Sequence, residues 1–277
     1  MDARSERFTT PALEGVTLRA VHRGNESHPK LVLLHGGGAN AHWWDQIAPP
    51  LAVRFHVIAI DFRGHGDSDY PERVEAGRFQ RDLEAVLEYL AAPDATLVGH
   101  SMGAHVALRH ATRSRGPRAL VAIEIARGAS PRARRSARLA LASRRSYRSE
   151  SEAIARYRFL PRSPGASEAL RRRLAAHSVR REPDGRFGFK FDPRWFALPP
   201  DPPLDLDRVA CPTLVVRGAE SSLLTAQGAE ALVAELPGAR LVEIEGAGHN
   251  VHLERPTEVL TAMERFLANA DGVGASR

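Results

Sequence analysis

The sequence predicts an α/β protein with a mostly parallel central sheet covered by helices on both faces. Short apolar runs bounded by Gly, Pro and Asp recur along the 277 residues, and helical patterns lie between several of them. Parallel strands read as continuous apolar runs because both of their faces are buried. A long basic interruption of this alternation predicts, in addition, a segment inserted into the fold.

The expected elements follow in chain order. The first strand alternates in polarity, and the others are candidates for buried strands: Val16–Val21, Lys30–Leu34, His56–Ile60, Ala95–Val98, Leu120–Ile125, Thr213–Val216 and Arg240–Ile244. Between the third and fourth strands, one helical face collects Phe79, Leu83, Val86, Leu87 and Leu90. Three more helices are expected at Met102–Thr112, Ala226–Leu236 and Pro256–Ala270.

The alternation stops after Ile125 and resumes at Pro212. Residues 127–200 hold 19 Lys and Arg but 6 Asp and Glu, whereas the whole chain carries a net charge of +6. Helices are expected around Pro131–Leu141, Ser151–Phe159 and Ser167–Ala176, followed by a loop rich in Phe, Trp, Pro and Asp. We assign residues 1–126 and 208–277 to the core. Residues 127–207 are an insertion over the C-terminal edge of the sheet, where open α/β sheets bind ligands.

Composition excludes several classes of protein. No apolar run approaches ~18 residues, so no membrane helix is expected, and the first residues offer no apolar stretch for a secretory signal. The single cysteine, Cys211, excludes an internal disulfide framework and a multi-thiolate metal site. The basic stretch carries no recognised nucleic-acid-binding motif. We expect a cytoplasmic protein without metal or cofactor that acts on a small molecule, not on nucleic acid or a membrane.

The motif with the clearest chemistry is Gly99-His100-Ser101-Met102-Gly103. It is a G-x-S-x-G sequence between an expected strand and an expected helix, which is the context that a nucleophilic serine requires. The small residues allow a tight turn that holds Ser101 up at the edge of the sheet. The helix N-terminus favours negative charge that develops nearby. Ser101 is therefore the candidate nucleophile.

A second motif, Leu33-Leu34-His35-Gly36-Gly37-Gly38, ends an earlier strand. Glycines there expose backbone N–H groups beside the nucleophile. The N–H of Gly37, with Gly38 as the alternative, and the N–H of Met102 are candidates for a two-donor oxyanion hole. His35 is expected to hold the glycine loop and not to react.

A third motif, Gly246-Ala247-Gly248-His249, follows the last expected strand. A general base must reach the serine oxygen, and a loop that leaves the last strand can do so. His249 directly follows the small residues of the turn and is preferred to His252. The chain order, serine before histidine, fits hydrolases in which the acid lies between them.

These motifs together resemble the α/β-hydrolase fold superfamily over nearly the whole chain. Two further stretches are similar to patterns of that superfamily: Asp61-Phe62-Arg63-Gly64-His65-Gly66-Asp67-Ser68 and Gly248-His249 followed by Leu253-Glu254-Arg255-Pro256. The resemblance implies a Ser–His–acid triad and a sheet of about eight strands. It also implies a helical cap between strands six and seven, which is the slot that residues 127–207 occupy.

The sequence departs from that superfamily at the acid. Most relatives place an Asp three or four residues beyond the glycine that corresponds to Gly218, and Ser221 and Ser222 stand there instead. A serine cannot carry the charge that stabilises an imidazolium. Glu124 lies at the end of the expected strand Leu120–Ile125, which corresponds to the sixth strand of that superfamily. It is the preferred acid, because some haloalkane dehalogenase relatives use a glutamate there, and Glu220 is the alternative. A serine–histidine dyad or a weakened enzyme would need neither.

The hypothesis that fits these residues best is a serine hydrolase that cleaves a carboxylic ester or lactone through an acyl-enzyme. Carbon–carbon bond hydrolysis, acyl transfer and perhydrolysis can use the same parts, and a non-catalytic ligand-binding protein on the same fold is the alternative from another class. Aromatic residues near the motifs suggest an apolar or aromatic substrate. The candidate substrate-binding residues are Trp43, Trp44, His100 and Trp195.

Overall fold

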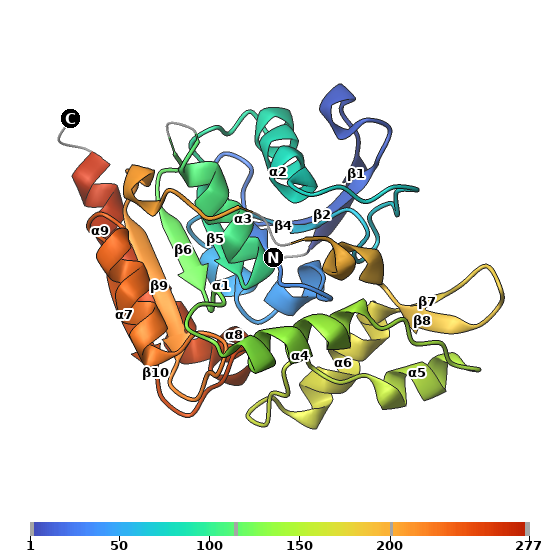
Figure 1. Cartoon of the computed structure of the whole chain (residues 1–277). Helices are drawn as coiled ribbons and strands as arrows, with labels where there is room; N and C mark the ends of the chain where they lie inside the picture. The colour runs from blue at the N-terminus through green and yellow to red at the C-terminus, as the bar shows by residue number, and fades with distance from the viewer. Residues whose placement is uncertain (1–2, 114–115, 200–201, 275–277) are drawn as a thin grey trace.

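The computed structural model describes residues 3–113, 116–199 and 202–274. Its centre is an eight-stranded sheet in the order β1-β2-β4-β3-β5-β6-β9-β10 (Figure 1). β1 and β2 are antiparallel to their neighbours, and the other six strands are mutually parallel. The strands are β1 (Arg4–Phe8), β2 (Leu18–Arg23), β3 (Lys30–Leu34), β4 (His56–Asp61), β5 (Thr96–His100), β6 (Leu120–Ile123), β9 (Thr213–Gly218) and β10 (Arg240–Ile244).

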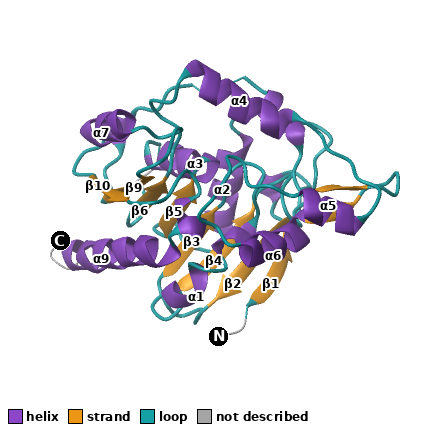
Figure 2. Ribbon diagram, turned by 90° about the horizontal axis from the view of Figure 1, so that it is seen from below, coloured by secondary structure: helices purple, strands orange, loops and turns teal. Residues whose placement is uncertain are grey.

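Helices cover both faces of the sheet (Figure 2). One face packs against α2, α3 and α7 in a core that includes Leu83, Ala107 and Leu232, and the other packs against α1 and α9 in a core that includes Leu51 and Met263. The predicted fold class, a mostly parallel sheet between two layers of helices, is confirmed. The helices of the core are α1 (Ala48–Leu51), α2 (Arg78–Tyr89), α3 (Met102–Ala111), α7 (Ala226–Glu235), α8 (Val251–Glu254) and α9 (Pro256–Gly274).

The chain between β6 and β9 forms a separate layer beside the C-terminal ends of the parallel strands (Figure 1). Its described residues form three helices, a short hairpin and two 3-10 turns, the second at Leu206–Arg208, and its apolar side chains join those of the core in a cluster around Trp43, Leu174 and Leu253. We call this layer the inserted segment. Its elements are α4 (Pro131–Ala142), α5 (Glu150–Arg156), α6 (Glu168–Ser178), β7 (Val179–Arg181), β8 (Phe187–Phe189) and η3 (Pro193–Ala197).

Helix starts in this layer follow a local signal that the sequence carries. Ser130, Ser149 and Ser167 each precede a helix and accept a hydrogen bond from a backbone N–H of its first turn. The first N–H groups of a helix have no partner within the helix, so a side-chain oxygen at this position stabilises the start. The three helices begin within two residues of the predicted positions because these caps are local.

The structure differs from the sequence-based prediction at several elements. β1 was not predicted, because RSERF has no apolar run: it is an edge strand in which Phe8 alone is buried. The second strand begins at Leu18, two residues later than expected. The aromatic stretch that was expected to be a loop contains β8 and η3, and the short helix α8 was missed. No helix in the described residues is long and apolar enough to cross a membrane.

Candidate active site

Ser101 lies in a sharp turn between β5 and α3, with backbone angles φ 51° and ψ −111°. A non-glycine residue rarely adopts a positive φ, and such strain occurs mostly where function requires it. Glycines are needed on both sides of the turn. A Cβ on Gly99 would lie 2.4 Å from the backbone of Gly103, and one on Gly103 would lie 2.2 Å from the carbonyl oxygen of Leu34. The turn therefore needs the small residues of the motif because three backbone segments meet there.

His249 lies in the turn after β10 and is almost fully buried. Its Nδ1 donates a hydrogen bond of 2.9 Å to Oε2 of Glu124. Its backbone carbonyl accepts a hydrogen bond of 3.0 Å from Nε2 of His100, the residue that precedes the serine. The loop is therefore attached to the C-terminal ends of β5 and β6, and Nε2 of the ring is left as the nitrogen that a general base would use.

Glu124 follows β6 directly, has a positive φ of 55° and is fully buried. Its carboxylate accepts three hydrogen bonds: from His249, from the backbone N–H of Gly218 at 2.7 Å, and from Oγ of Ser221 at 2.6 Å. The structure thus brings the preferred candidate acid to the histidine. One of the two serines at the usual Asp position, Ser221, contacts that carboxylate from the end of β9.

The alternative acid, Glu220, lies elsewhere. Its side chain is exposed, and its backbone N–H donates to the carbonyl oxygen of Ala247. Ser222 is exposed as well. Since the backbone hydrogen bond holds Glu220 at the rim of the turn, its carboxylate does not take the place beside His249 that Glu124 occupies.

Burial governs the electrostatics of this pair. Loss of solvent raises the pKa of Glu124 to about 8, although the hydrogen bonds from Ser221 and Gly218 and the charge of Arg217 act in the opposite direction. Burial also lowers the pKa of His249 to about 4. Both shifts have the same physical cause: burial disfavours an isolated charge on either side chain.

The glycine loop after β3 faces the serine turn. The position that a Cβ of Gly36 would take lies 3.4 Å from Cβ of Ser101. Gly37 and Met102 line the same cavity as Ser101, whereas Gly38 lines a neighbouring hollow and does not border that cavity. His35 fixes the loop: its Nδ1 donates to the carbonyl oxygen of Gly36 at 2.7 Å, and its Nε2 accepts from the N–H of Phe62 at 3.1 Å. This location favours Gly37 over Gly38 as the oxyanion donor.

A cavity of about 410 Å³ lies over these residues, between the core and the inserted segment. Ser101 and His249 line it, together with three of the four candidate substrate-binding residues: Trp43, His100 and Trp195. The prediction for the fourth, Trp44, is wrong. Its side chain is fully buried among α1 and the sheet, because its place in the 3-10 turn Ala41–Trp44 directs it into the core.

Several residues of the cavity wall were not identified from sequence. They come from six separate parts of the chain, and no periodic pattern connects them: Phe79, Ile125, Leu141, Leu160, Phe196 and Leu223. Only Phe196 belongs to an aromatic cluster that the sequence displays. Ser221 was noted for its position, but its contact with Glu124 depends on the pairing of β6 with β9.

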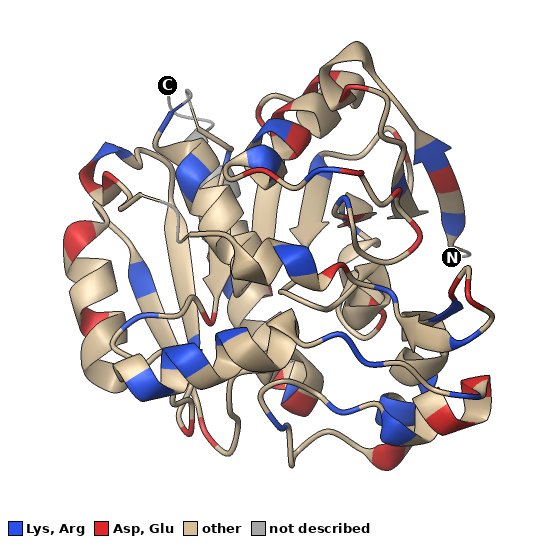
Figure 3. Ribbon diagram, turned by 45° about the vertical axis from the view of Figure 1, so that its right-hand side comes forward, with Lys and Arg blue, Asp and Glu red and all other residues tan. Residues whose placement is uncertain are grey.

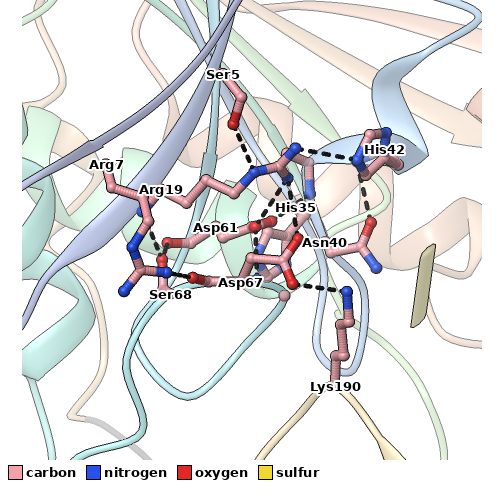
Figure 4. Close-up of polar contacts among 12 residues, drawn as sticks. Ser5, Arg7, Arg19, His35, Asn40, His42, Asp61, Asp67, Ser68 and Lys190 are labelled. Carbon is pink, nitrogen blue, oxygen red and sulfur yellow. Dashed lines mark hydrogen bonds and ion pairs between the residues drawn. The ribbon is translucent and has the colours of Figure 1, made fainter. Parts of the chain in front are cut away.

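Asp61 organises the loop that follows β4 (Figure 4). Its buried carboxylate accepts hydrogen bonds from the N–H groups of Ala41 at 2.7 Å and Asp67 at 2.9 Å, and from Arg19 at 3.2 Å. A Cβ on Gly66 would lie 2.2 Å from this carboxylate, which explains the glycine. The motif around Asp61 therefore supports the glycine loop and does not border the cavity.

One group among the described residues has the composition of a metal site: His42, Asp45 and His177. Arg19 donates to Nε2 of His42 at 3.2 Å (Figure 4). The proton of the ring is therefore on Nδ1, which donates to Asp45 at 3.1 Å. The rings of His42 and His177 stack with centroids 3.7 Å apart. Both ring nitrogens of His42 therefore form hydrogen bonds, and the guanidinium of Arg19 lies at the nitrogen that a metal ion would need. We assign the group to the contact between core and inserted segment.

Comparisons with known proteins identify the family to which the chain belongs. Residues 31–262 match the model of the alpha/beta hydrolase family. The chain is 29% identical to Epoxide hydrolase A of Mycobacterium tuberculosis, over 98% of this chain and 99% of that protein. It is 29% identical to Esterase YbfF of Escherichia coli, over 91% of this chain and 98% of that protein.

Among solved structures, E-2-(acetamidomethylene)succinate hydrolase superposes with a TM-score of 0.82 and 26% identity, covering 96% of this chain and all of that one. An alpha/beta hydrolase from Novosphingobium aromaticivorans superposes with a TM-score of 0.80 and 25% identity, covering 96% of this chain and 98% of that one. The residues matched by the family model, 31–262, include Ser101 and His249. The chain is therefore a hydrolase of the α/β fold and belongs to the alpha/beta hydrolase family.

Proposed function

We propose that this hydrolase cleaves a carboxylic ester or lactone through an acyl-enzyme on Ser101. The observation that carries the proposal is the hydrogen bond from His249 Nδ1 to the buried Glu124. A histidine oriented by a carboxylate, in the cavity that a strained serine also lines, is the arrangement that activates a hydroxyl for attack on a carbonyl carbon.

The proposed reaction has two halves. In the first, Oγ of Ser101 attacks the acyl carbon while Nε2 of His249 takes the hydroxyl proton, and the oxyanion lies against the N–H groups of Gly37 and Met102. The carbonyl re-forms, the ester C–O bond breaks, and His249 returns its proton to the leaving alcohol. In the second, His249 takes a proton from water, the hydroxide attacks the acyl carbon, and Ser101 recovers its proton as the carboxylic acid leaves.

The nucleophile separates this proposal from the chemistry of one relative. Epoxide hydrolases of this fold use an Asp nucleophile, and a hydroxyl stands at position 101 in this chain. The esterase among the relatives supports ester cleavage. The cavity walls support an apolar or aromatic substrate, since Trp43, Trp195 and Phe196 face the space next to Ser101.

The first experiment is intact-mass analysis after exposure to a fluorophosphonate probe, which reacts with activated serines. We expect one adduct on the wild-type protein and none on Ser101→Ala, while the matched control Ser222→Ala, at an exposed position, reacts like the wild type. Absence of an adduct on the folded wild-type protein would refute an activated Ser101. A ligand-binding protein on this fold would then be the better description.

A further inference from the structure

Three hollows lie in series from the serine to the surface. The active-site cavity shares Gly37, Trp43, Leu141 and Leu160 with a narrow hollow of about 30 Å³, which we call the narrow arm. The narrow arm shares Arg145 and Arg158 with an open hollow of about 420 Å³, which we call the outer basin. The shared lining residues place the three hollows next to one another, from the oxyanion loop to the outside of the inserted segment.

The narrow arm is suited to an apolar chain. Between its inner end at Gly37 and Trp43 and its outer end at the arginines, its walls are aliphatic and aromatic side chains, among them Tyr157, Phe189 and Phe191. Its volume is less than a tenth of that of the active-site cavity, about 30 Å³ against about 410 Å³. So small a hollow favours a slender, unbranched chain, and apolar walls favour methylene groups.

The outer basin is basic. It is lined by three arginines, Arg145, Arg156 and Arg158, and by one carboxylate, that of Glu152. Among the described residues, the side chains of Arg145 and Arg156 have no ion-pair or hydrogen-bond partner. The guanidinium of Arg158 donates to two backbone carbonyls, and Glu152 accepts from the backbone N–H of Arg148.

Other arginines of the inserted segment are paired. Arg171 and Arg172 both contact the carboxylate of Glu168, at 2.6 and 2.9 Å. Basic residues recur on the ribbon of the molecule (Figure 3), and at the outer basin three arginines face a hollow with Glu152 as the one carboxylate among its lining residues. Exposed guanidinium groups with free N–H donors are suited to bind a carboxylate in a bidentate manner.

We propose that the acyl part of the substrate is an unbranched chain that ends in a carboxylate, with the chain in the narrow arm and the carboxylate at Arg145 and Arg158. This inference rests on the ester hydrolysis proposed above. The acyl part is assigned to the arm because it stays bound to Ser101 beside Gly37, whereas the alcohol must leave and water must enter through the wider cavity.

The test compares two esters of equal chain length: the mono-p-nitrophenyl ester of octanedioic acid and p-nitrophenyl octanoate. We expect a KM about tenfold lower for the charged ester in the wild type, which corresponds to one charge-assisted hydrogen bond. The double variant Arg145→Gln, Arg158→Gln should lose this preference and keep its rate on the neutral ester. Arg132→Gln, which lines none of the three hollows, should behave like the wild type.

Equal KM values for the two esters in the wild type, or a preference that survives in the double variant, would overturn the proposal. If the wild type cleaves neither ester, the proposed ester hydrolysis fails, and calorimetric binding of octanedioate and octanoate to the same proteins decides about the subsite. Tighter binding of octanedioate that the double variant loses would still support it, whereas equal binding would refute it.

Discussion

The most informative perturbation of the candidate active site is Ser221→Ala. Oγ of Ser221 donates to the Glu124 carboxylate at 2.6 Å and lowers the pKa of this buried group, which burial has raised to about 8. In the proposed mechanism, Glu124 must be ionised to stabilise the imidazolium of His249. Loss of the donor disfavours the ionised form, so it raises the pKa of the carboxyl further.

The expected magnitude follows from the strength of that hydrogen bond. A hydrogen bond to a charged group contributes about 1.5–3 kcal/mol, and about 1.4 kcal/mol corresponds to one pKa unit. For the wild type, we expect kcat/KM to rise with pH and to reach half of its maximum near pH 8. For Ser221→Ala, the rising limb should move at least about one unit to higher pH. At pH 7 this lowers kcat/KM about tenfold, because the fraction of enzyme with an ionised Glu124 falls about tenfold when the pKa rises by one unit.

The assay measures kcat/KM for p-nitrophenyl butyrate between pH 6 and 10. Hydrolysis is monitored by titrating the released acid, because the absorbance of p-nitrophenol itself changes with pH. Ser221→Thr keeps a hydroxyl and should restore the profile towards the wild type, and Ser222→Ala, at an exposed position, should leave it unchanged. A Ser221→Ala profile that superposes on that of the wild type would refute the coupling between this hydroxyl and the acid.

Three further predictions test the acid, the cavity wall and the core. Glu124→Gln should lower kcat about 10⁴-fold, as for a comparable triad acid, whereas Glu220→Gln should change it little; the opposite order, measured by ester turnover, would reassign the acid. Trp44→Ala should lower the free energy of unfolding by about 3–5 kcal/mol in urea titrations, with KM unchanged if the protein folds. Trp43→Ala should raise KM. Asp82→Ala should cost about 3–5 kcal/mol in the same titrations, because it leaves the buried guanidinium of Arg63 without its carboxylate.

Local signals explain why the fold class could be predicted from sequence. The apolar runs that became β3, β4 and β5 are buried on both faces, so their composition alone distinguishes them from loops. The serine caps fixed the starts of the inserted helices in the same way. β1 gave no such signal, because an edge strand with one buried residue can form from almost any polar sequence that pairs with β2.

The residues of the candidate site also fall into two groups, those identified from local sequence and those placed by contacts between distant segments. Ser101 was identified because it lies in a turn so crowded that only small neighbours fit, and the glycines next to it display this requirement. His249 was identified because it directly follows the small residues of the turn after the last strand. The contact of Glu124 with His249, the support from Ser221 and the burial of Trp44 depend on segments far apart in the chain.

The sequence by itself therefore determined the layers of the fold and the two turns that carry the candidate nucleophile and base, since these depend on periodicity and on residues next to one another. The tertiary structure decided which glutamate meets the histidine, which tryptophan borders the cavity and where the arginines of the inserted segment face a hollow. These features depend on how strands pair and on the direction of each side chain, because residues 94 to 125 positions apart are brought within hydrogen-bond distance only by the folded sheet.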